Sequence, residues 1–212
     1  MINRLTFTLF LIGSGATVFA QSAKEYTEQG KIMYENREYM QAIINYNKAI
    51  ELDPDYFQAY YLRGRVKEEF DDLHGAMKDF SNSIEKNSKF ADGYFSRGVI
   101  KFKLQDYYGA IDDFSKTIEL NPNHLDAYYK RGQAKQQLEA YQDAISDCTK
   151  IIELNPKSLD AYFLRGVLRL EFGQQKEGCL DLSKAGELGD IKAYEIIREK
   201  CNQQVYGSDS GN

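Results

Sequence analysis

The stretch DAYYKRG at residues 126–132 returns almost unchanged as DAYFLRG at residues 160–166. The two copies lie 34 residues apart, and the same step along the chain links five glycines. A fixed period of this length is the sequence signature of a repeat architecture, in which one small structural unit is copied along the chain. The glycines are Gly30, Gly64, Gly98, Gly132 and Gly166.

Spacing within one unit predicts a pair of helices. Tyr128, Arg131, Gly132 and Lys135 follow one another at helical intervals and share one helix face. A second helix is expected from residues 144 to 152, after a tight reversal of the chain. Because a residue that precedes proline disfavours the helical conformation, Asn155 before Pro156 ends the unit. Each unit is therefore expected to be an antiparallel helix pair.

The pattern resembles the tetratricopeptide repeat family, whose 34-residue unit carries aromatic residues, glycine, a small residue and proline at fixed offsets. The resemblance covers residues 23–192. It implies an all-α fold, a right-handed α-solenoid of stacked antiparallel helix pairs. Two columns depart from the family pattern: the large residue before the glycine is arginine or glutamine, and the phenylalanine column drifts to Cys148 and Leu182. The expected units are 23–56, 57–90, 91–124, 125–158 and 159–190.

The glycine column needs a compensating gain, because glycine inside a helix costs about 1 kcal/mol relative to alanine. A column of small residues on the second helix keeps the same register. We expect the two columns to face each other, so that the helix backbones approach closely. The small residues are Ala42, Ala76, Ala110, Ala144 and Gly178.

An arginine column and an aspartate column occur together, sixteen residues apart. Four units carry both residues, whereas the first unit has Gln29 and Asn45 in their places. We therefore predict an ion pair between the two helices of a unit, the alternative being a coincidence of surface charges. The pairs are Arg63 with Asp79, Arg97 with Asp113, Arg131 with Asp147, and Arg165 with Asp181.

The two ends of the chain differ from the repeat. Residues 1–20 carry only Arg4 as a charge, followed by an apolar run that ends in Val-Phe-Ala, which is typical of a cleaved signal peptide. The prediction is export to the periplasm or secretion, and the alternative is a leader retained as a membrane anchor. At the other end, a solenoid over 21–204 would finish in a capping helix at 191–203, before a flexible tail at 205–212.

Composition argues against several classes of function. The chain has 27 basic and 32 acidic residues, so its net charge of -5 disfavours binding to nucleic acid or to anionic lipid. Its two histidines, His74 and His124, are too few and too scattered for a metal site or a catalytic triad. We therefore predict no enzyme activity, no cofactor and no metal.

Three cysteines in an exported chain suggest one disulfide and one free thiol. Cys179 falls on the second helix of the fifth unit, and Cys201 falls on the inward face of the capping helix. We predict that these two residues form a disulfide that fastens the cap, the alternative being two separate buried thiols. Cys148 would then be a small core residue.

The resemblance implies that a ligand binds in a groove lined by the first helix of each unit. Aromatic and acidic columns on that face would suit a protein or peptide ligand, and a basic peptide in particular. Alternatively, the aspartates only stabilise helix N-termini, and the aromatic residues pack on neighbouring units. The expected groove residues are Tyr61, Arg65, Asp92, Phe95, Asp126, Tyr129, Gln133, Asp160 and Phe163.

The predicted function is that of an exported, non-catalytic scaffold that mediates protein–protein interaction through this groove. One alternative is a structural component of an envelope assembly, which would use the convex face and the ends of the solenoid. Another is an accessory subunit of a secreted enzyme. The identity of the partner and the oligomeric state stay open, because proteins of one repeat fold differ in function.

Overall fold

A computed structural model describes residues 21–201, which form helices and turns without a strand in that range. The expected leader at 1–20, the end of the capping helix and the tail at 205–212 lie outside the described residues. The first helices of five successive pairs are α1 (Ala23–Glu35), α3 (Phe57–Glu69), α5 (Ala91–Lys103), α7 (Leu125–Gln137) and α9 (Leu159–Glu171). The second helices are α2 (Tyr39–Leu52), α4 (Leu73–Lys86), α6 (Tyr107–Leu120), α8 (Tyr141–Leu154) and α10 (Gln175–Glu187).

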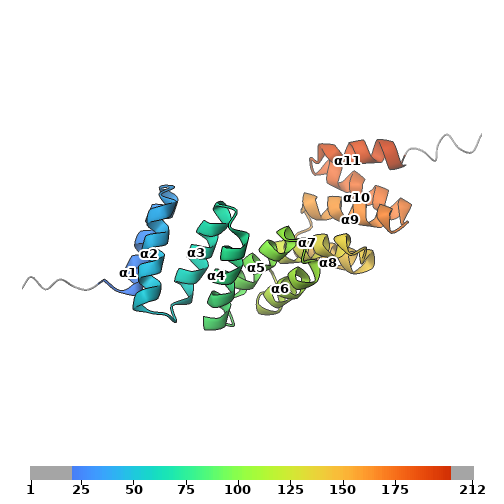
Figure 1. The fold of residues 1–212 in the computed structure, drawn as a ribbon. Coiled ribbons are helices and arrows are strands. Elements are labelled where there is room, and N and C mark those ends of the chain that lie inside the picture. The colour runs from blue at the N-terminus through green and yellow to red at the C-terminus, as the bar shows by residue number, and fades with distance from the viewer. Residues whose placement is uncertain (1–20, 202–212) are drawn as a thin grey trace, which may run out of the picture.

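The helix pairs stack one after another along the molecule, and their axes turn progressively between the two ends (Figure 1). Within each pair the helices pack against each other, and each second helix also packs on the first helix of the next unit. The core is a series of small clusters between successive helices, such as Ala76, Phe80 and Ile100. The all-α solenoid predicted from the repeat is confirmed.

Two kinds of turn join the helices. The reversal inside each unit contains one residue with left-handed backbone, and only the fifth unit uses glycine there, at Gly173. Between units, the side chain at the end of the second helix accepts a hydrogen bond from the backbone two residues later. Asn87 makes this turn without a following proline, in the same way as Asn121 does before Pro122. The hydrogen bond to the Asn or Asp side chain occurs in all of these turns, whereas the proline does not.

In the first three units the glycine column has a closer neighbour than the one predicted. A Cβ atom added at Gly98 would lie 2.8 Å from Cε1 of Phe114, so the aromatic ring of the second helix occupies the space beside the glycine. Gly30 and Gly64 meet Tyr46 and Phe80 in the same way. These three glycines make room for a ring. The expected contact with the small-residue column is present in the last two units, where a Cβ atom added at Gly132 would lie 3.6 Å from the backbone oxygen of Ala144, and one added at Gly166 would lie 3.0 Å from that of Gly178.

The C-terminal cap consists of α11 (Ile191–Ile196), which continues as a π-helical segment, η1 (Ile197–Cys201). Asp190 caps α11 by accepting hydrogen bonds from two backbone N–H groups. Ala193 is buried against α10, in one cluster with Leu182. A disulfide joins Cys179 on α10 to Cys201 at the end of η1, so the two cysteines paired from the sequence are bonded to each other.

Candidate functional site

A repeated ion pair joins the two helices of each unit from the second to the fifth. In the third unit, Arg97 donates from Nε and Nη2 to the two carboxylate oxygens of Asp113, at 2.9 and 2.7 Å. The Asp113 side chain is only 4% exposed, and its hydrogen bonds raise the pKa of Arg97 above its ordinary value. All four predicted pairs are present. These buried pairs join the two helices of a unit and therefore have a structural role.

The network extends further than the sequence predicted. Each aspartate binds a second cation one helical turn after the arginine, as Lys101 does at 2.8 Å from Asp113. Each arginine also donates from Nη1 to the preceding unit, as Arg97 does to Ser81. In the first unit Gln29 and Asn45 replace the arginine and the aspartate together, so this unit lacks the ion pair. The second cations are Lys67, Lys101, Lys135 and Arg169.

The four aromatic residues expected in the groove are all half-buried in contacts between helices. Tyr61 packs against Phe80 and Phe90, with ring centroids 5.7 and 4.9 Å apart. Phe95 packs against Phe114 and His124. Tyr129 and Phe163 border buried clusters, and burial raises the pKa of Tyr129. These four side chains therefore pack between helices and are only partly exposed to solvent.

The three aspartates of the expected groove, in contrast, are exposed to solvent. Asp92, Asp126 and Asp160 lie in the first turn of α5, α7 and α9, where a carboxylate favours the helix dipole. None of them forms a salt bridge with another described residue. Their charges are available to a ligand as well as to the helix.

Hydrogen bonds between first helices show that these helices lie side by side. Tyr34 donates to Glu69, Lys103 to Glu68, and Gln136 to Glu171, in each case between successive first helices. We call the exposed surface of α1, α3, α5, α7 and α9 the first-helix face. Gln133 lies on this face and accepts a hydrogen bond from Lys130.

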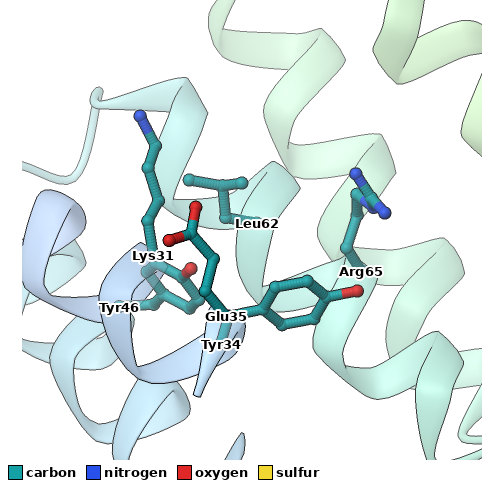
Figure 2. Close-up of a pocket in the computed structure, with 6 residues that line it drawn as sticks. All are labelled: Lys31, Tyr34, Glu35, Tyr46, Leu62 and Arg65. Atoms are coloured by element: carbon teal, nitrogen blue, oxygen red, sulfur yellow. The ribbon is translucent and has the colours of Figure 1, made fainter. Parts of the chain in front are cut away.

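A hollow of about 220 Å³ opens between α1 and α3, and we call it the N-terminal hollow (Figure 2). The ring of Tyr34 points toward Arg65, whose guanidinium lies 5.8 Å from the ring centroid. Burial raises the pKa of Tyr46, so its hydroxyl stays protonated. The lining residues are Lys31, Tyr34, Glu35, Tyr46, Leu62 and Arg65.

A second hollow, of about 350 Å³, lies between α9 and the cap, and we call it the C-terminal hollow. Val167, Leu170 and Ile196 give it apolar walls, while Glu171 and Glu199 bring carboxylates. Gln175 donates a hydrogen bond to the backbone carbonyl of Lys200 beside it. Each hollow has room for a side chain of a ligand, and the N-terminal hollow is smaller than the pockets that usually bind drug-sized molecules. Neither hollow could be read from the sequence, because each depends on how neighbouring units stack.

Several other features of the described chain bear on chemistry. In residues 21–201, His, Cys, Asp and Glu side chains form no group of three suited to a metal ion. Every helix in that range is too short or too polar to span a lipid bilayer. Cys148 is a buried free thiol, and burial raises its pKa to about 12. A thiol with so high a pKa is a poor nucleophile at neutral pH.

Comparisons with known families match the repeat. A family model described as TPR repeat matches residues 24–69, and one described as tetratricopeptide repeat matches 91–124 and 125–158, together more than half of the chain. No relative was found among curated protein sequences.

Solved structures share the fold. The crystal structure of MamA protein is 22% identical, with a TM-score of 0.73, over 84% of this chain and 94% of its own. YrrB, described as a TPR protein with an unusual peptide-binding site, is 22% identical, with a TM-score of 0.76, over 84% of this chain and 92% of its own. MamA from Desulfovibrio magneticus RS-1 is 17% identical, with a TM-score of 0.74, over 80% and 96%.

Proposed function

Because this chain belongs to the tetratricopeptide repeat family, we propose that it is an exported, non-catalytic scaffold that binds a segment of a partner protein on its first-helix face. Repeat scaffolds of this kind use an extended surface to hold an extended ligand. The partner is a protein or a peptide, and a basic one fits the acidic column. The solved structure of YrrB, which shares the fold, is described as having a peptide-binding site.

One observation carries this proposal: the first-helix face combines exposed charges with hollows sized for side chains. Asp92, Asp126 and Asp160 recur at one position of three successive units, without a salt-bridge partner in the described residues. The half-buried aromatic rings beside them form a firm floor, since each is held by its neighbours. A rigid floor with free charges above it costs little ordering when a ligand binds.

Two alternatives use other surfaces of the molecule. A structural component of an envelope assembly would bind through the second helices or through the ends of the solenoid. Exposed apolar residues occur there too, including Met40 and Ile44 on α2 and Leu180 on α10. An accessory subunit of a secreted enzyme would act only beside a catalytic partner. Export itself rests on the sequence of residues 1–20.

A selection of random peptides displayed on phage, with the full chain as target, tests the proposal. The best peptide is then measured by fluorescence polarisation against wild type and against the double variant Asp92→Lys, Asp126→Lys. The matched control is Asp143→Lys, Glu177→Lys, which changes the same charge in the first turns of two second helices. We expect the first variant to weaken binding about tenfold or more, as for a lost charge-assisted contact, and the control to bind as wild type.

Two results contradict the proposal. If no peptide is enriched, the first-helix face does not bind extended segments. If the control variant loses affinity while the first-helix variant keeps it, the second helices form the interaction surface, and the structural alternative is favoured.

A further inference from the structure

The two hollows occupy the same place in the repeat, at opposite ends of the first-helix face. Three positions of α1 line the N-terminal hollow, and the three positions of α9 that lie four units later line the C-terminal hollow. On the facing helix, Leu62 and Arg65 correspond to Ile196 and Glu199 once the two-residue shift of the cap is included. The corresponding first-helix residues are Lys31 and Val167, Tyr34 and Leu170, and Glu35 and Glu171.

The charges of the two hollows are opposite, although their positions correspond. Each hollow has a glutamate at the same position of the repeat, Glu35 in the N-terminal hollow and Glu171 in the C-terminal hollow. The N-terminal hollow adds two cations, Lys31 and Arg65, so its lining carries one net positive charge, with Glu28 in contact with Lys31 and Glu69 in contact with Tyr34 at its edge. The C-terminal hollow adds Glu199 together with one cation, Lys200, so negative charge prevails.

A column of residues outside the hollows also changes from positive to negative charge along the solenoid. At the second position of the five first helices, the residues change from a cation through a neutral amide to three carboxylates. Positive charge thus lies toward α1, and negative charge toward α9 and the cap. The column is Lys24, Gln58, Asp92, Asp126 and Asp160.

Arg65 is not paired with a carboxylate, although Tyr61 and Glu68 lie close to its guanidinium. Its neighbour Arg63 is committed to Asp79, whereas Arg65 forms no salt bridge with any described residue. The ring of Tyr34 lies beside Arg65, with 5.8 Å between the guanidinium and the ring centroid (Figure 2). A guanidinium presents paired donors that match the two oxygens of a carboxylate. Lys31 at the rim adds positive charge, although its ammonium group also contacts Glu28 at 2.8 Å.

The C-terminal hollow suits a lysine or arginine side chain. Such a side chain buries its aliphatic stem on an apolar surface and keeps its charged head near solvent. Val167, Leu170 and Ile196 supply the apolar surface, and Glu171 and Glu199 supply carboxylates for the head. The disulfide at Cys201 fastens the segment that carries Glu199.

We propose that the first-helix face reads the order of charges along its ligand: an acidic side chain binds at the N-terminal hollow, and a lysine or arginine binds at the C-terminal hollow. This inference rests on the function proposed above and narrows it. The ligand is an extended segment that is basic at one end only, so it binds in a single direction.

The peptide selection described above tests the charge order when it is repeated with the single variant Arg65→Glu. Arg65 is exposed and outside the Arg–Asp network, so the variant is expected to fold. Lys78→Glu, an equal charge reversal at an exposed position of α4, is the matched control. We expect wild type to enrich peptides with Asp or Glu toward one end and Lys or Arg toward the other, always in the same order. Arg65→Glu is expected to weaken such a peptide about tenfold, and changing the acidic residue of the peptide to lysine is expected to restore binding.

The outcomes separate this inference from the function beneath it. A selection that enriches no peptide overturns both. Enriched peptides without a constant charge order, or an unchanged affinity of Arg65→Glu for an ordered peptide, overturn the inference alone and leave the first-helix face as a binding surface.

Discussion

The glycine column allows a sharp test, because Gly132 faces no aromatic ring, whereas Gly98 does. In the third unit, an alanine at position 98 would place its Cβ 2.8 and 3.0 Å from two ring atoms of Phe114, and 3.2 Å from Cβ of Asp113. Phe114 is fully buried and Asp113 is held by its ion pairs, so neither can withdraw freely. In the fourth unit, Cys148 replaces the ring, and an alanine at position 132 would meet nothing closer than 3.6 Å.

Both substitutions gain the same helix propensity, about 1 kcal/mol for glycine to alanine. Only Gly98→Ala adds the overpacking cost, which is typically about 1–3 kcal/mol in a close-packed core. We therefore expect Gly132→Ala to be as stable as wild type or more stable by up to about 1 kcal/mol. Gly98→Ala should be less stable than Gly132→Ala by about 1–3 kcal/mol, because the gain in propensity cancels in the comparison.

Urea unfolding of the full chain, followed by far-ultraviolet circular dichroism, measures both variants against wild type. Equal m-values are required for the comparison, since a changed m-value would show that the folded or unfolded state had altered. If Gly98→Ala and Gly132→Ala have the same free energy of unfolding, the ring is not what requires the glycine, and the reasoning fails. A strongly destabilised Gly132→Ala would equally contradict it.

Three further predictions concern stability and the cysteines. Arg97→Gln and Asp113→Asn are expected to couple by about 1–3 kcal/mol in a double-mutant cycle of unfolding, and additive values would reject an energetic role for the pair. Because burial raises the pKa of Cys148 to about 12, its thiol stays protonated and should react with a disulfide reagent only after denaturation, as one thiol per chain; reaction in the folded state, or three thiols, would contradict this. Cys179→Ser with Cys201→Ser should lower the free energy of unfolding by about 3 kcal/mol and speed amide exchange in the cap, and an unchanged cap would refute the role of the disulfide as its fastener.

The regular part of the fold could be predicted because one period governs it. The five first helices begin at residues 23, 57, 91, 125 and 159, which are one repeat apart. The Arg–Asp pair was also visible, since Gln29 and Asn45 depart from both columns at once. The second cation was missed, although Met33 stands in its column in the same first unit. The same comparison between columns could have found it.

The glycine contact was predicted only in part, because the direction of the neighbouring side chains was not visible in the sequence. Registered columns show which residues recur, but they do not show which of two columns on the second helix faces the first. A side chain added at Gly98 would meet the ring of Phe114 first, whereas one added at Gly166 would meet the backbone of Gly178 as well as Leu182. Similarly, the sequence left open whether Tyr61 is exposed or packed, and its contacts with Phe80 and Phe90 lie within its own unit.

The hollows show why a repeat protein can have a site at all. Where every unit is the same, every junction between units is the same, and a ligand would find no reason to bind in one register. Recognition therefore has to come from positions where a column changes. Arg65 in the second unit and Glu199 in the cap occupy corresponding positions with opposite charge, while the residues that hold the units together stay constant. On this reasoning, substitutions in the constant columns should change stability without changing which ligand is preferred, whereas substitutions at the changing positions should alter preference with little effect on stability.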